Sequence, residues 1–461
     1  MGIVKPRTLS GFLELLPRQQ VFFDAMARSL RDSFSLYGFT PLDTPLMEAA
    51  EILLAKGGGE TEKQIYSLRK GDVDLALRFE LTASLAKYVA LNYNNLAFPF
   101  RRYEIGKVYR GERPQRGRFR EFYQADIDII GDGAMDILNE AEIPSVIYKC
   151  FTSLGLERFA IHVNNRKMLN GFFEIIGVSD AAANVMRAVD KLGKIGPEKL
   201  TGMLTCELTL SQAQADSILE LLTYPGDPFE IFEKYSGKSG MFDLGVSELA
   251  AVKRHIAGFG VPDSYFKVDL SIARGLDYYT GTVYETFMTD HPEVGSICSG
   301  GRYDNLAEYY TDRKLPGVGI SIGLSRLFYV LQEQGLLNDS VLAAPADVLI
   351  IPMTDDLGHA VALATAMREA GLRTQIYGEN KKFKAKVSYA DKLGIPYVVF
   401  LGEDEISAGM ITVKDMSSGS QTTASAGILI AGLIKKAKAL RRGTPIKDKD
   451  SDTRQSGESS D

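Results

Sequence analysis

The sequence predicts a protein of mixed α and β structure, with a large first domain and a smaller α/β domain near the C-terminus. Three observations predict it. Strand-like runs flank a polar loop between Phe100 and Ile130, residues from about 170 to 262 follow mostly helical patterns, and short strands alternate with helices after Ala344. The 461 residues suffice for about three such parts, at roughly 150 residues per domain.

The composition is that of a globular, cytoplasmic protein. Hydrophobic residues make up 45% and charged residues 24%, and no apolar run is long enough to cross a membrane. The three cysteines show no CxxC spacing, which argues against a disulfide framework or a zinc site and predicts a reducing, cytoplasmic location. The net charge of −6 does not exclude a nucleic-acid partner, because binding depends on local charge.

The first elements are a helix and an extended segment. Residues 17 to 37 carry apolar side chains at helical spacing. The segment Phe39–Pro45 contains two prolines, which favour an extended conformation and predict an edge strand.

Two strands joined by a basic loop are predicted between residues 100 and 130. Residues 101 to 120 hold eight arginines and lysines against two glutamates. In the second strand, alternation places Phe122, Gln124, Asp126 and Asp128 on one face. Polar and apolar side chains would also alternate along an ordinary half-buried strand whose polar face meets water. An aromatic ring, an amide and carboxylates on one face, opposite a loop rich in arginines, favour a pocket instead.

The later elements continue this organisation. Strand-like runs at 266–270 and 281–287 precede a glycine-rich stretch, 299–304, that leads toward a helix. In the C-terminal region, strands are predicted at 348–351, 374–377 and 397–401, with helices at 357–370 and 384–393 between them. Residues 447–461 are polar throughout and predict a disordered tail.

Two familiar sites are excluded by spacing. Gly237-Lys238-Ser239 resembles the end of a phosphate-binding P-loop, but Phe232 stands where that motif needs its first glycine. The four histidines are scattered along the chain, so we assign no metal site to protein side chains.

Four segments together carry a family resemblance. Residues 37–48, 109–122 and 317–326 resemble motifs 1, 2 and 3 of the class II aminoacyl-tRNA synthetases, in the same order. Residues 273–281, Ala-Arg-Gly-Leu-Asp-Tyr-Tyr-Thr-Gly, are similar to the histidine signature of the histidyl-tRNA synthetases, and residues 299–304 resemble that family's second signature. The resemblance extends from near the N-terminus to about residue 440.

The resemblance implies a specific architecture. Residues 1–335 would form an α+β class II synthetase catalytic domain, an antiparallel sheet flanked by helices, with a helical insertion at about 175–260. Residues 345–440 would form a C-terminal α/β anticodon-binding domain, followed by the tail at 447–461. Motif 1 in this family builds a homodimer, so we expect one here, with the strand near Pro45 at the interface.

The resemblance also implies a histidine–tRNA ligase. Such an enzyme uses ATP, with Mg²⁺, to activate L-histidine and loads it onto tRNA(His). The reaction brings a carboxylate against a phosphate, so fixed cations are needed, and planar arginines suit this task. Matching positions make Arg110 and Arg274 catalytic, and assign ATP binding to Arg110, Glu112, Phe122 and Arg326.

Histidine binding requires an acceptor for the ammonium group and polar partners for the ring. Matching positions assign Glu80, Thr82 and Gln124 to the ammonium end, and Asp128, Tyr278 and Tyr279 to the imidazole. A site built to hydrogen-bond the ring rejects apolar analogues, because its buried groups would be left unpaired.

The expected macromolecular partner is tRNA, with no DNA and no membrane. The basic loop residues Arg113, Gln115, Arg116 and Arg118 would meet the acceptor end of the tRNA. Lysines 381, 382, 384, 386 and 392 in the C-terminal domain are candidate phosphate contacts, although either cluster could also be a solvated surface.

Three other interpretations compete with this one. A histidine-binding regulatory subunit of ATP phosphoribosyltransferase would typically lack both the histidine signature and the C-terminal domain, which this chain keeps. A synthetase for threonine or proline does not account for residues 273–281, and a scaffold protein would not need Arg110, Arg274 and Arg326 in this order. Two departures from the family pattern are Leu81, where bacterial members often have glycine, and Ser325, where an acidic residue usually stands.

Overall fold

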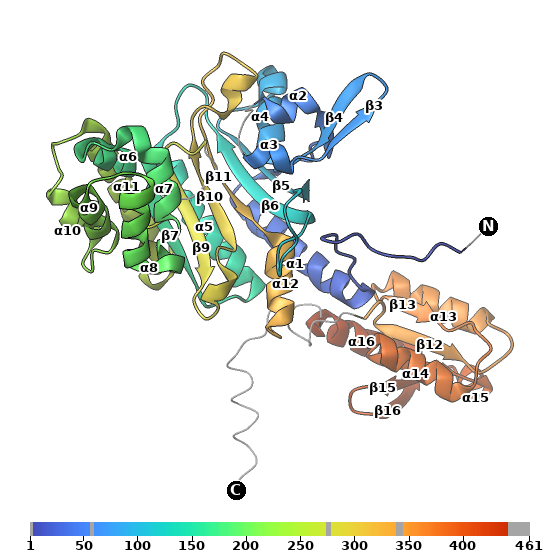
Figure 1. Cartoon of the computed structure of the whole chain (residues 1–461). Helices are drawn as coiled ribbons and strands as arrows, with labels where there is room; N and C mark the ends of the chain where they lie inside the picture. The colour runs from blue at the N-terminus through green and yellow to red at the C-terminus, as the bar shows by residue number, and fades with distance from the viewer. Residues whose placement is uncertain (1–2, 56–59, 273–277, 338–343, 441–461) are drawn as a thin grey trace, which may run out of the picture. The chain divides into compact units, whose positions relative to one another are not determined.

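The computed structural model describes residues 3–55, 60–272, 278–337 and 344–440. Contacts between residues divide the chain into two compact units. One consists of residues 1–14 and 27–335, and the other of residues 15–26 and 336–461 (Figure 1). Arg274 and the tail at 447–461 lie outside the described residues, so the structure does not bear on them.

An eight-stranded sheet forms the centre of the first unit, in the order β1-β5-β6-β11-β10-β9-β7-β8. Neighbouring strands are antiparallel except for the two edge pairs, β1 with β5 and β7 with β8, which are parallel. This confirms the largely antiparallel sheet expected of the class II fold. The strands are β1 (Thr40–Pro41), β5 (Phe100–Tyr109), β6 (Glu121–Ile130), β7 (Phe159–Asn165), β8 (Phe266–Val268), β9 (Thr282–Met288), β10 (Cys298–Tyr303) and β11 (Gly317–Ile322).

Strands β5 and β6 are the two predicted from alternation, and they pair over their whole length. β5 alternates between more and less buried residues, whereas the last seven residues of β6 are all buried. The difference arises because β6 lies between β5 and β11 and also contacts the helix α12 (Leu324–Glu333). β6 is therefore a rigid base for side chains that point away from the sheet.

The glycine-rich stretch at 299–304 differs from its prediction. It is part of strand β10, and only a short 3-10 helix, Leu306–Tyr309, follows it. A Cβ atom on Gly300 would lie 2.1 Å from the carbonyl oxygen of Gly319 in β11, so glycine is needed for the strands to approach. Gly300 thus marks close packing between neighbouring strands of the sheet.

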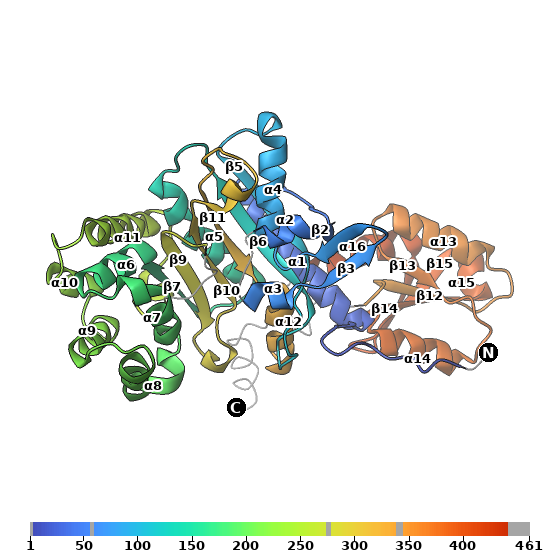
Figure 2. The same ribbon diagram turned by 45° about the horizontal axis from the view of Figure 1, so that its top comes forward.

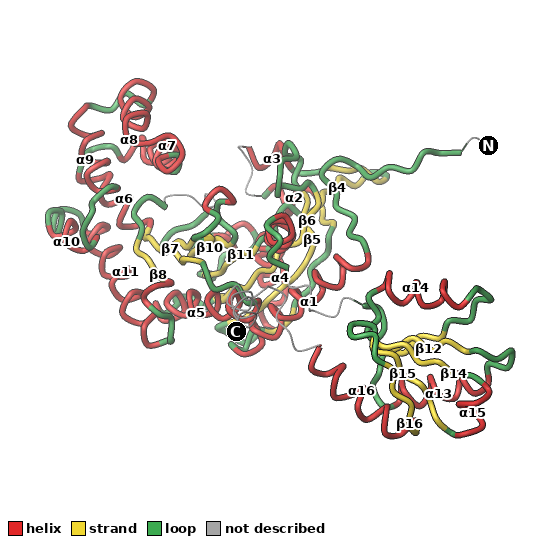
Figure 3. Tube along the Cα trace, turned by 90° about the horizontal axis from the view of Figure 1, so that it is seen from below, coloured by secondary structure: helices red, strands yellow, loops and turns green. Residues whose placement is uncertain are grey.

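Helices pack against the eight-stranded sheet. α5 (Ile137–Leu154) lies along one face of the sheet in Figure 3, with Asp136 capping its first turn and Gly155 ending it in the left-handed conformation. The predicted N-terminal helix is α1 (Pro17–Leu36).

A smaller sheet, in the order β2-β4-β3, is formed by β2 (Met47–Ala49), β3 (Ser67–Lys70) and β4 (Val73–Leu77). The helices beside it are α2 (Ala50–Leu54), α3 (Glu60–Gln64) and α4 (Thr82–Asn92).

Helices α6 to α11 form the segment predicted to be helical, gathered near β7 (Figure 2). Ser211 and Gln214 make a capping box at the start of α9. The helices are α6 (Arg166–Ile175), α7 (Ala182–Val189), α8 (Leu192–Gly202), α9 (Gln212–Leu222), α10 (Pro228–Glu233) and α11 (Gly240–Gly258). Short 3-10 helices are Tyr93–Asn95, Ser179–Ala181, Asp263–Tyr265 and Pro292–Val294, and Met203–Glu207 is a π-helix.

The second unit contains a five-stranded sheet in the order β13-β12-β14-β15-β16. Its first three strands are parallel and were predicted, whereas the antiparallel strands β15 and β16 were not. The elements are β12 (Val348–Pro352), α13 (Gly358–Glu369), β13 (Thr374–Ile376), α14 (Phe383–Leu393), β14 (Tyr397–Leu401), α15 (Glu403–Ala408), β15 (Met410–Asp415), β16 (Gln421–Ser425) and α16 (Ala426–Leu440). Apolar side chains of β12, β14, β15, α13 and α16 form its core. Among the described residues of the whole chain, no helix is both long and apolar enough to cross a membrane.

Candidate active site

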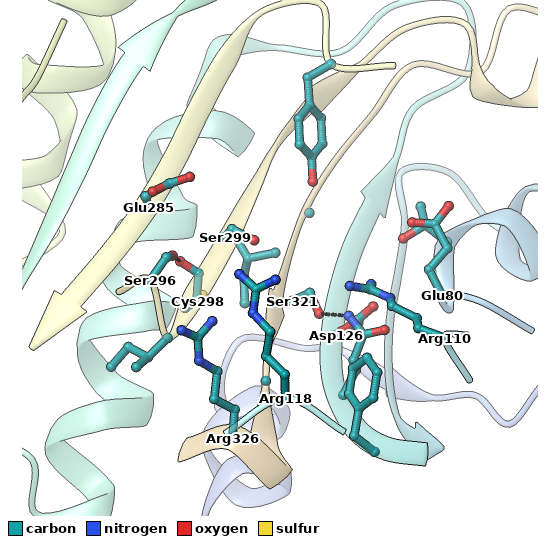
Figure 4. A pocket seen from close by; sticks show the side chains of 18 of the residues that line it. Glu80, Arg110, Arg118, Asp126, Glu285, Ser296, Cys298, Ser299, Ser321 and Arg326 are labelled. Atoms are coloured by element: carbon teal, nitrogen blue, oxygen red, sulfur yellow. Dashed lines mark hydrogen bonds between the residues drawn. The ribbon is translucent and has the colours of Figure 1, made fainter. Parts of the chain in front are cut away.

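A cavity of about 440 Å³ lies over strands β6, β10 and β11 of the first unit (Figure 4). It brings together side chains from segments that are far apart in the sequence. Eleven of the residues predicted from the sequence line it: Glu80, Thr82, Arg110, Glu112, Arg118, Phe122, Gln124, Asp128, Tyr278, Tyr279 and Arg326. The predicted residues Arg113, Gln115 and Arg116 do not line the cavity, and Arg274 lies outside the described residues.

Arg110 follows directly after β5 and is held between two aromatic rings. Its guanidinium carbon lies 4.4 Å from the centre of the Phe79 ring and 5.1 Å from that of Phe122, and its Nε donates to the Phe79 carbonyl oxygen at 3.3 Å. Burial lowers the pKa of Arg110, and Glu80 and Glu112 oppose this shift. The rings orient the cation without neutralising it, which leaves its charge available to an anion.

The basic loop between β5 and β6 turns at Gly117, whose φ is +70°. Gln115 and Arg118 exchange backbone hydrogen bonds across this turn, at 3.3 and 2.8 Å. Arg118 points into the cavity and lies 3.4 Å from the Glu112 carboxylate, whereas the exposed Arg116 pairs with Glu333 at 2.5 Å. The predicted loop residues therefore separate into one that faces the cavity and others that face outward.

Arg326 lies in the first turn of α12 and donates to the carbonyl oxygen of Val294. In Figure 4, Arg118 and Arg326 both project toward the segment Ser296–Ser299, and Arg110 lies on the side of Glu80. Ser325, the departure from the family pattern, accepts a 2.9 Å hydrogen bond from the backbone N–H of Tyr123. It therefore ties α12 to β6 beside Arg326.

The opposite part of the cavity is rich in acceptors and phenols. Tyr278 donates to a carboxylate oxygen of Glu80 at 3.0 Å, and its ring meets that of Tyr279 edge to face. Gln124 donates to the hydroxyl of Ser321 at 2.5 Å. Burial raises the pKa of both tyrosines, so they remain neutral hydrogen-bond donors at ordinary pH. Leu81, the other departure, is fully buried beside this group.

Asp128 lines the cavity, and two residues hold its carboxylate. Tyr303 donates to Oδ1 at 2.6 Å, and the fully buried Arg102 lies 2.7 Å from Oδ2 in an ion pair that is not aligned as a hydrogen bond. Gly319 faces this carboxylate from β11, and a Cβ there would lie 2.2 Å from Oδ1. Burial raises the pKa of Asp128 to about 6, although Arg102 and Tyr303 act in the opposite direction.

Several cavity residues were not assigned a role from the sequence. Asp126, Ser321 and Glu285 all line the cavity, and Asp126 lies between Gln124 and Asp128 on β6. The alternation of β6 had already placed Asp126 on the same face, so a signal for it existed. Nothing in the sequence pattern distinguishes Ser321 or Glu285, because their position depends on strand pairing.

A partly buried network of ion pairs and hydrogen bonds supports the segment that follows Tyr279. Arg302 pairs with Glu140 at 2.5 Å and with Asp304 at 3.0 Å. Thr280 donates to Asp304 at 2.6 Å, and Thr282 donates to Glu140 at 2.5 Å. These contacts join β9, β10 and α5, so the cavity wall carrying Tyr278 and Tyr279 is anchored in the sheet.

The arrangement suits a reaction between two anions. Three arginines, Arg110, Arg118 and Arg326, provide positive charge in the cavity, and carboxylates and phenols provide acceptors and donors within the same space. Among the described residues, no group of three or more His, Cys, Asp or Glu side chains is placed to hold a metal ion by itself. A polyphosphate and a cationic amino acid are the ligands that such a charge distribution fits.

Comparisons with known proteins agree with this geometry. The family model described as "Histidyl-tRNA synthetase" matches residues 11–327, and the one described as "Anticodon binding domain" matches residues 347–436. The histidine–tRNA ligase of Clostridium tetani is 51% identical, over 92% of this chain and 97% of that protein. That of Finegoldia magna is 44% identical, over 91% and 97%.

Solved structures give the same result. The crystal structure of histidyl-tRNA synthetase from Nostoc sp. PCC 7120 is similar with a TM-score of 0.87 and 37% identity, over 94% of this chain and all of that one. The match includes both units and is not confined to the catalytic sheet. The chain belongs to the histidyl-tRNA synthetase family.

Proposed function

We propose that this protein activates L-histidine with ATP and transfers the histidyl group to the 3′ end of tRNA(His). The observation that carries the proposal is the cavity that combines Arg110, Arg118 and Arg326 with Glu80, Gln124 and Tyr278. Relatives of 40 to 51% identity over nearly the whole chain are histidine–tRNA ligases, which supports the same activity.

In the first step, the histidine carboxylate attacks the α-phosphorus of ATP, the bond to the β-phosphate oxygen breaks, and pyrophosphate leaves. Negative charge grows on the phosphate oxygens in the transition state, and fixed cations stabilise it. We assign Arg110 to the carboxylate and α-phosphate, and Arg274 as the second catalytic arginine. Phe122 would stack on the adenine, Glu112 would orient its amino group, and Arg326 would lie against the other adenine face near the γ-phosphate.

The second step transfers the histidyl group to a ribose hydroxyl of the terminal tRNA nucleotide, and AMP leaves. For histidine itself, Glu80, Thr82 and Gln124 would accept the ammonium group, and Asp128, Tyr278 and Tyr279 would surround the imidazole. Tyr278 lies 3.0 Å from Glu80, which links the two ends of this subsite.

The cavity fits a Mg²⁺ ion held mainly by the triphosphate. Such an ion needs only one or two protein carboxylates, and Glu112 and Glu285 line the cavity. The ion would neutralise charge on the leaving pyrophosphate.

For tRNA, we assign Arg113, Gln115, Arg116 and Arg118 to the acceptor end and the C-terminal unit to the anticodon. The exposed lysines Lys381, Lys382 and Lys384 at the start of α14 are suited to phosphate contacts. Such contacts supply affinity and orientation, and base recognition needs further residues.

A cytoplasmic homodimer is the proposed working state. Leu46 and Met47, in the motif 1 segment, are 44% and 43% exposed, as expected of apolar side chains that a second copy would cover. Cys150, Cys206 and Cys298 are free thiols, which suits a reducing compartment. Light scattering should give a mass near twice that of one chain, and a monomer at micromolar concentration would contradict the dimer.

The competing function is a histidine sensor, a regulatory paralogue that binds histidine and does not activate it. ATP–pyrophosphate exchange measured with each of the twenty amino acids separates the two. Exchange that depends on histidine alone is expected, and charging of tRNA(His) should follow it. Histidine binding without exchange would overturn the proposal in favour of the sensor.

A further inference from the structure

Arg78 is a fully buried cation that lies outside the cavity. It follows strand β4, is 1% exposed, and is not one of the residues that line the cavity. A buried charge is costly to the folded protein unless neighbouring groups satisfy it. The groups that satisfy Arg78 therefore indicate what this cation contributes.

The guanidinium of Arg78 joins the motif 1 segment to strand β5. Nη1 donates to the carbonyl oxygen of Thr44 at 2.6 Å and lies 2.7 Å from Oε1 of Glu104, and Nε donates to the carbonyl oxygen of Lys107 at 2.7 Å. Thr44 donates to the same carboxylate oxygen from its hydroxyl at 2.9 Å and from its backbone N–H at 3.0 Å. Thr44, Arg78 and Glu104 thus form a closed buried cluster, because each of them contacts the other two.

The backbone of Arg78 makes the same connection. Its N–H donates to the carbonyl oxygen of Leu46 at 3.0 Å, and its carbonyl oxygen accepts from the N–H of Tyr109 at 2.9 Å. Strand β5 leaves room for the side chain, since a Cβ on Gly106 would lie 2.3 Å from Nη2 of Arg78. The position of Arg78 is therefore fixed from both the motif 1 segment and β5.

Two residues of the active site are chain neighbours of this connection. Phe79 directly follows Arg78, and Arg110 directly follows Tyr109. The hydrogen bond between Arg78 and Tyr109 therefore places Phe79 beside Arg110. The ring of Phe79 lies 4.4 Å from the guanidinium carbon of Arg110, and its carbonyl oxygen accepts from Nε of Arg110 at 3.3 Å. A shift of Arg78 relative to β5 would move the ring and the carbonyl group that orient Arg110.

We propose that Arg78 is a positioning residue for Arg110, and that Thr44 and Glu104 hold Arg78 in the place that this role requires. The inference rests on the proposed function, in which Arg110 stabilises the transition state. A displacement of about 1 Å in such a group can cost roughly 100-fold in rate. Because Arg78 does not line the cavity, its effect on the reaction passes through Phe79.

A simpler role for the cluster is that of a structural ion pair. Changing a structural pair alters the free energy of unfolding and leaves the turnover of the folded protein unchanged. Changing a positioning residue lowers kcat in molecules that are fully folded. The free energy of unfolding and kcat, measured on the same variants, therefore separate the two roles.

The first variant is Arg78→Lys, measured in histidine-dependent pyrophosphate exchange. Lysine keeps the positive charge and lacks the planar fork that reaches three acceptors at once. We expect kcat to fall roughly 10- to 100-fold, while the KM values for histidine and ATP each change by less than about threefold. Arg373→Lys is the matched control, because Arg373 pairs with the buried Asp347 of the second unit at 2.9 Å, and it should stay within about twofold.

The second variant is Thr44→Val, which decides the question if Arg78→Lys folds poorly. It removes the hydroxyl that contacts Glu104 and Arg78 and keeps nearly the same shape. We expect kcat to fall roughly 3- to 10-fold, as for the loss of one hydrogen bond. Thr40→Val is its control, because the hydroxyl of Thr40 donates instead to the carbonyl oxygen of Arg101, and its kcat should equal that of the wild type.

A double-mutant cycle tests whether Arg78 acts through Arg110. The effect of Arg78→Lys is measured in the wild type and in the Arg110→Lys background. In that background the planar cation is absent, so the position of Phe79 matters little and Arg78→Lys should lower kcat by less than about threefold. Independent effects would multiply instead.

Two results would overturn the proposal. One is a loss of stability in urea unfolding of Arg78→Lys and Thr44→Val with kcat unchanged, which would make the cluster structural. The other is an effect of Arg78→Lys that persists in full in the Arg110→Lys background, which would show that Arg78 does not act through Arg110. Absence of exchange in the wild type is a distinct outcome, because it would refute the proposed function and, with it, this inference.

Discussion

Arg110 is a cation whose direction is set by aromatic rings. Phe79 and Phe122 lie on the guanidinium at 4.4 and 5.1 Å, and a backbone carbonyl accepts from its Nε. A planar guanidinium can stack on an aromatic ring, whereas an ammonium group cannot. The identity of the side chain should therefore matter as much as its charge.

Replacing Arg110 with lysine keeps the charge and removes the planar fork. We expect kcat/KM for pyrophosphate exchange to fall by roughly 10²- to 10³-fold, the usual effect of losing one oriented donor to a developing anion. Arg69→Lys, at an exposed arginine of β3, is the matched control and should stay within about twofold. A decrease of less than fivefold for Arg110→Lys would mean that charge alone suffices.

The shifted pKa of Asp126 leads to a prediction of how the free energy of unfolding depends on pH. Its pKa is raised from 3.8 to about 8, so the folded protein keeps this proton while the unfolded chain loses it near pH 4. The stabilising effect is complete below about pH 4 and is lost as the pH rises toward 8, by at most roughly 1.4 kcal/mol per pH unit.

Asp126→Asn should therefore gain stability relative to the wild type between pH 5 and pH 8. Urea unfolding of both proteins at several pH values, without histidine, measures the difference. Asp74→Asn, at an exposed carboxylate of β4, serves as the control and should run parallel to the wild type. Parallel curves for Asp126→Asn would show that the carboxyl group is not protonated in the folded state.

At the scale of elements, strand β11 can form part of the cavity floor because Gly319 has no side chain. Gly319 pairs with Asp128, and a Cβ there would lie 2.2 Å from the carboxylate and 2.4 Å from the carbonyl oxygen of Ile127. Glycine is needed here for close approach and not for an unusual backbone angle.

Gly319→Ala should displace Asp128 and weaken histidine binding more than ATP binding. We expect a stability loss of roughly 1–3 kcal/mol, typical of an overpacked core, together with a raised KM for histidine. Gly193→Ala in α8, where a Cβ would meet nothing within 4 Å, is the control. Thermal unfolding and exchange kinetics measure both effects, and an unchanged KM for histidine would separate Gly319 from the histidine subsite.

The helices and strands also show where local sequence patterns are sufficient to predict secondary structure. The strands at 100–130 and the helix α1 were predicted because alternation and helical spacing are local signals. The strand β10 was not predicted, because glycines are unfavourable in strands and its pairing with β9 and β11 is non-local. β15 and β16 were missed for the same reason, since their pairing with β14 defines them.

At the scale of the whole molecule, tRNA binding should depend strongly on salt, and amino acid activation should not. Counterions released by phosphate contacts make binding weaken as salt rises, by roughly one unit of the log–log slope per contact. The KM for tRNA in aminoacylation is therefore expected to rise steeply between about 50 and 200 mM KCl. A flat dependence would argue against phosphate contacts.

The triple variant Lys381→Gln, Lys382→Gln, Lys384→Gln should reduce that slope by up to roughly three units. Pyrophosphate exchange should be unchanged, because these lysines lie in the C-terminal unit and the cavity lies in the first. An unaltered slope would show that these side chains form a solvated surface only.

The sequence by itself determined the class of this protein, since its motifs combine local residue types in a fixed order. Arg110, Gln124 and Asp128 were all assigned to one site, and the structure brings eleven of the predicted residues together in one cavity. Their individual roles remain predictions. The site residues could be assigned from the sequence because each step of the reaction needs a particular chemical group, such as a planar cation or a carboxylate.

Only the tertiary structure decided which of these side chains already have hydrogen-bond or ion-pair partners within the protein. Arg102 and Tyr303 reach Asp128 from β5 and β10, so no pattern within β6 could indicate that its oxygens are held. The same is true of Asp126, whose Oδ1 has no hydrogen-bond partner within the described part of the chain. In the same way, the pairing of β6 with β11 brings Ser321 and Gly319 to the cavity floor. Hydrogen-bond partners depend on distances between strands, and sequence order does not contain those distances.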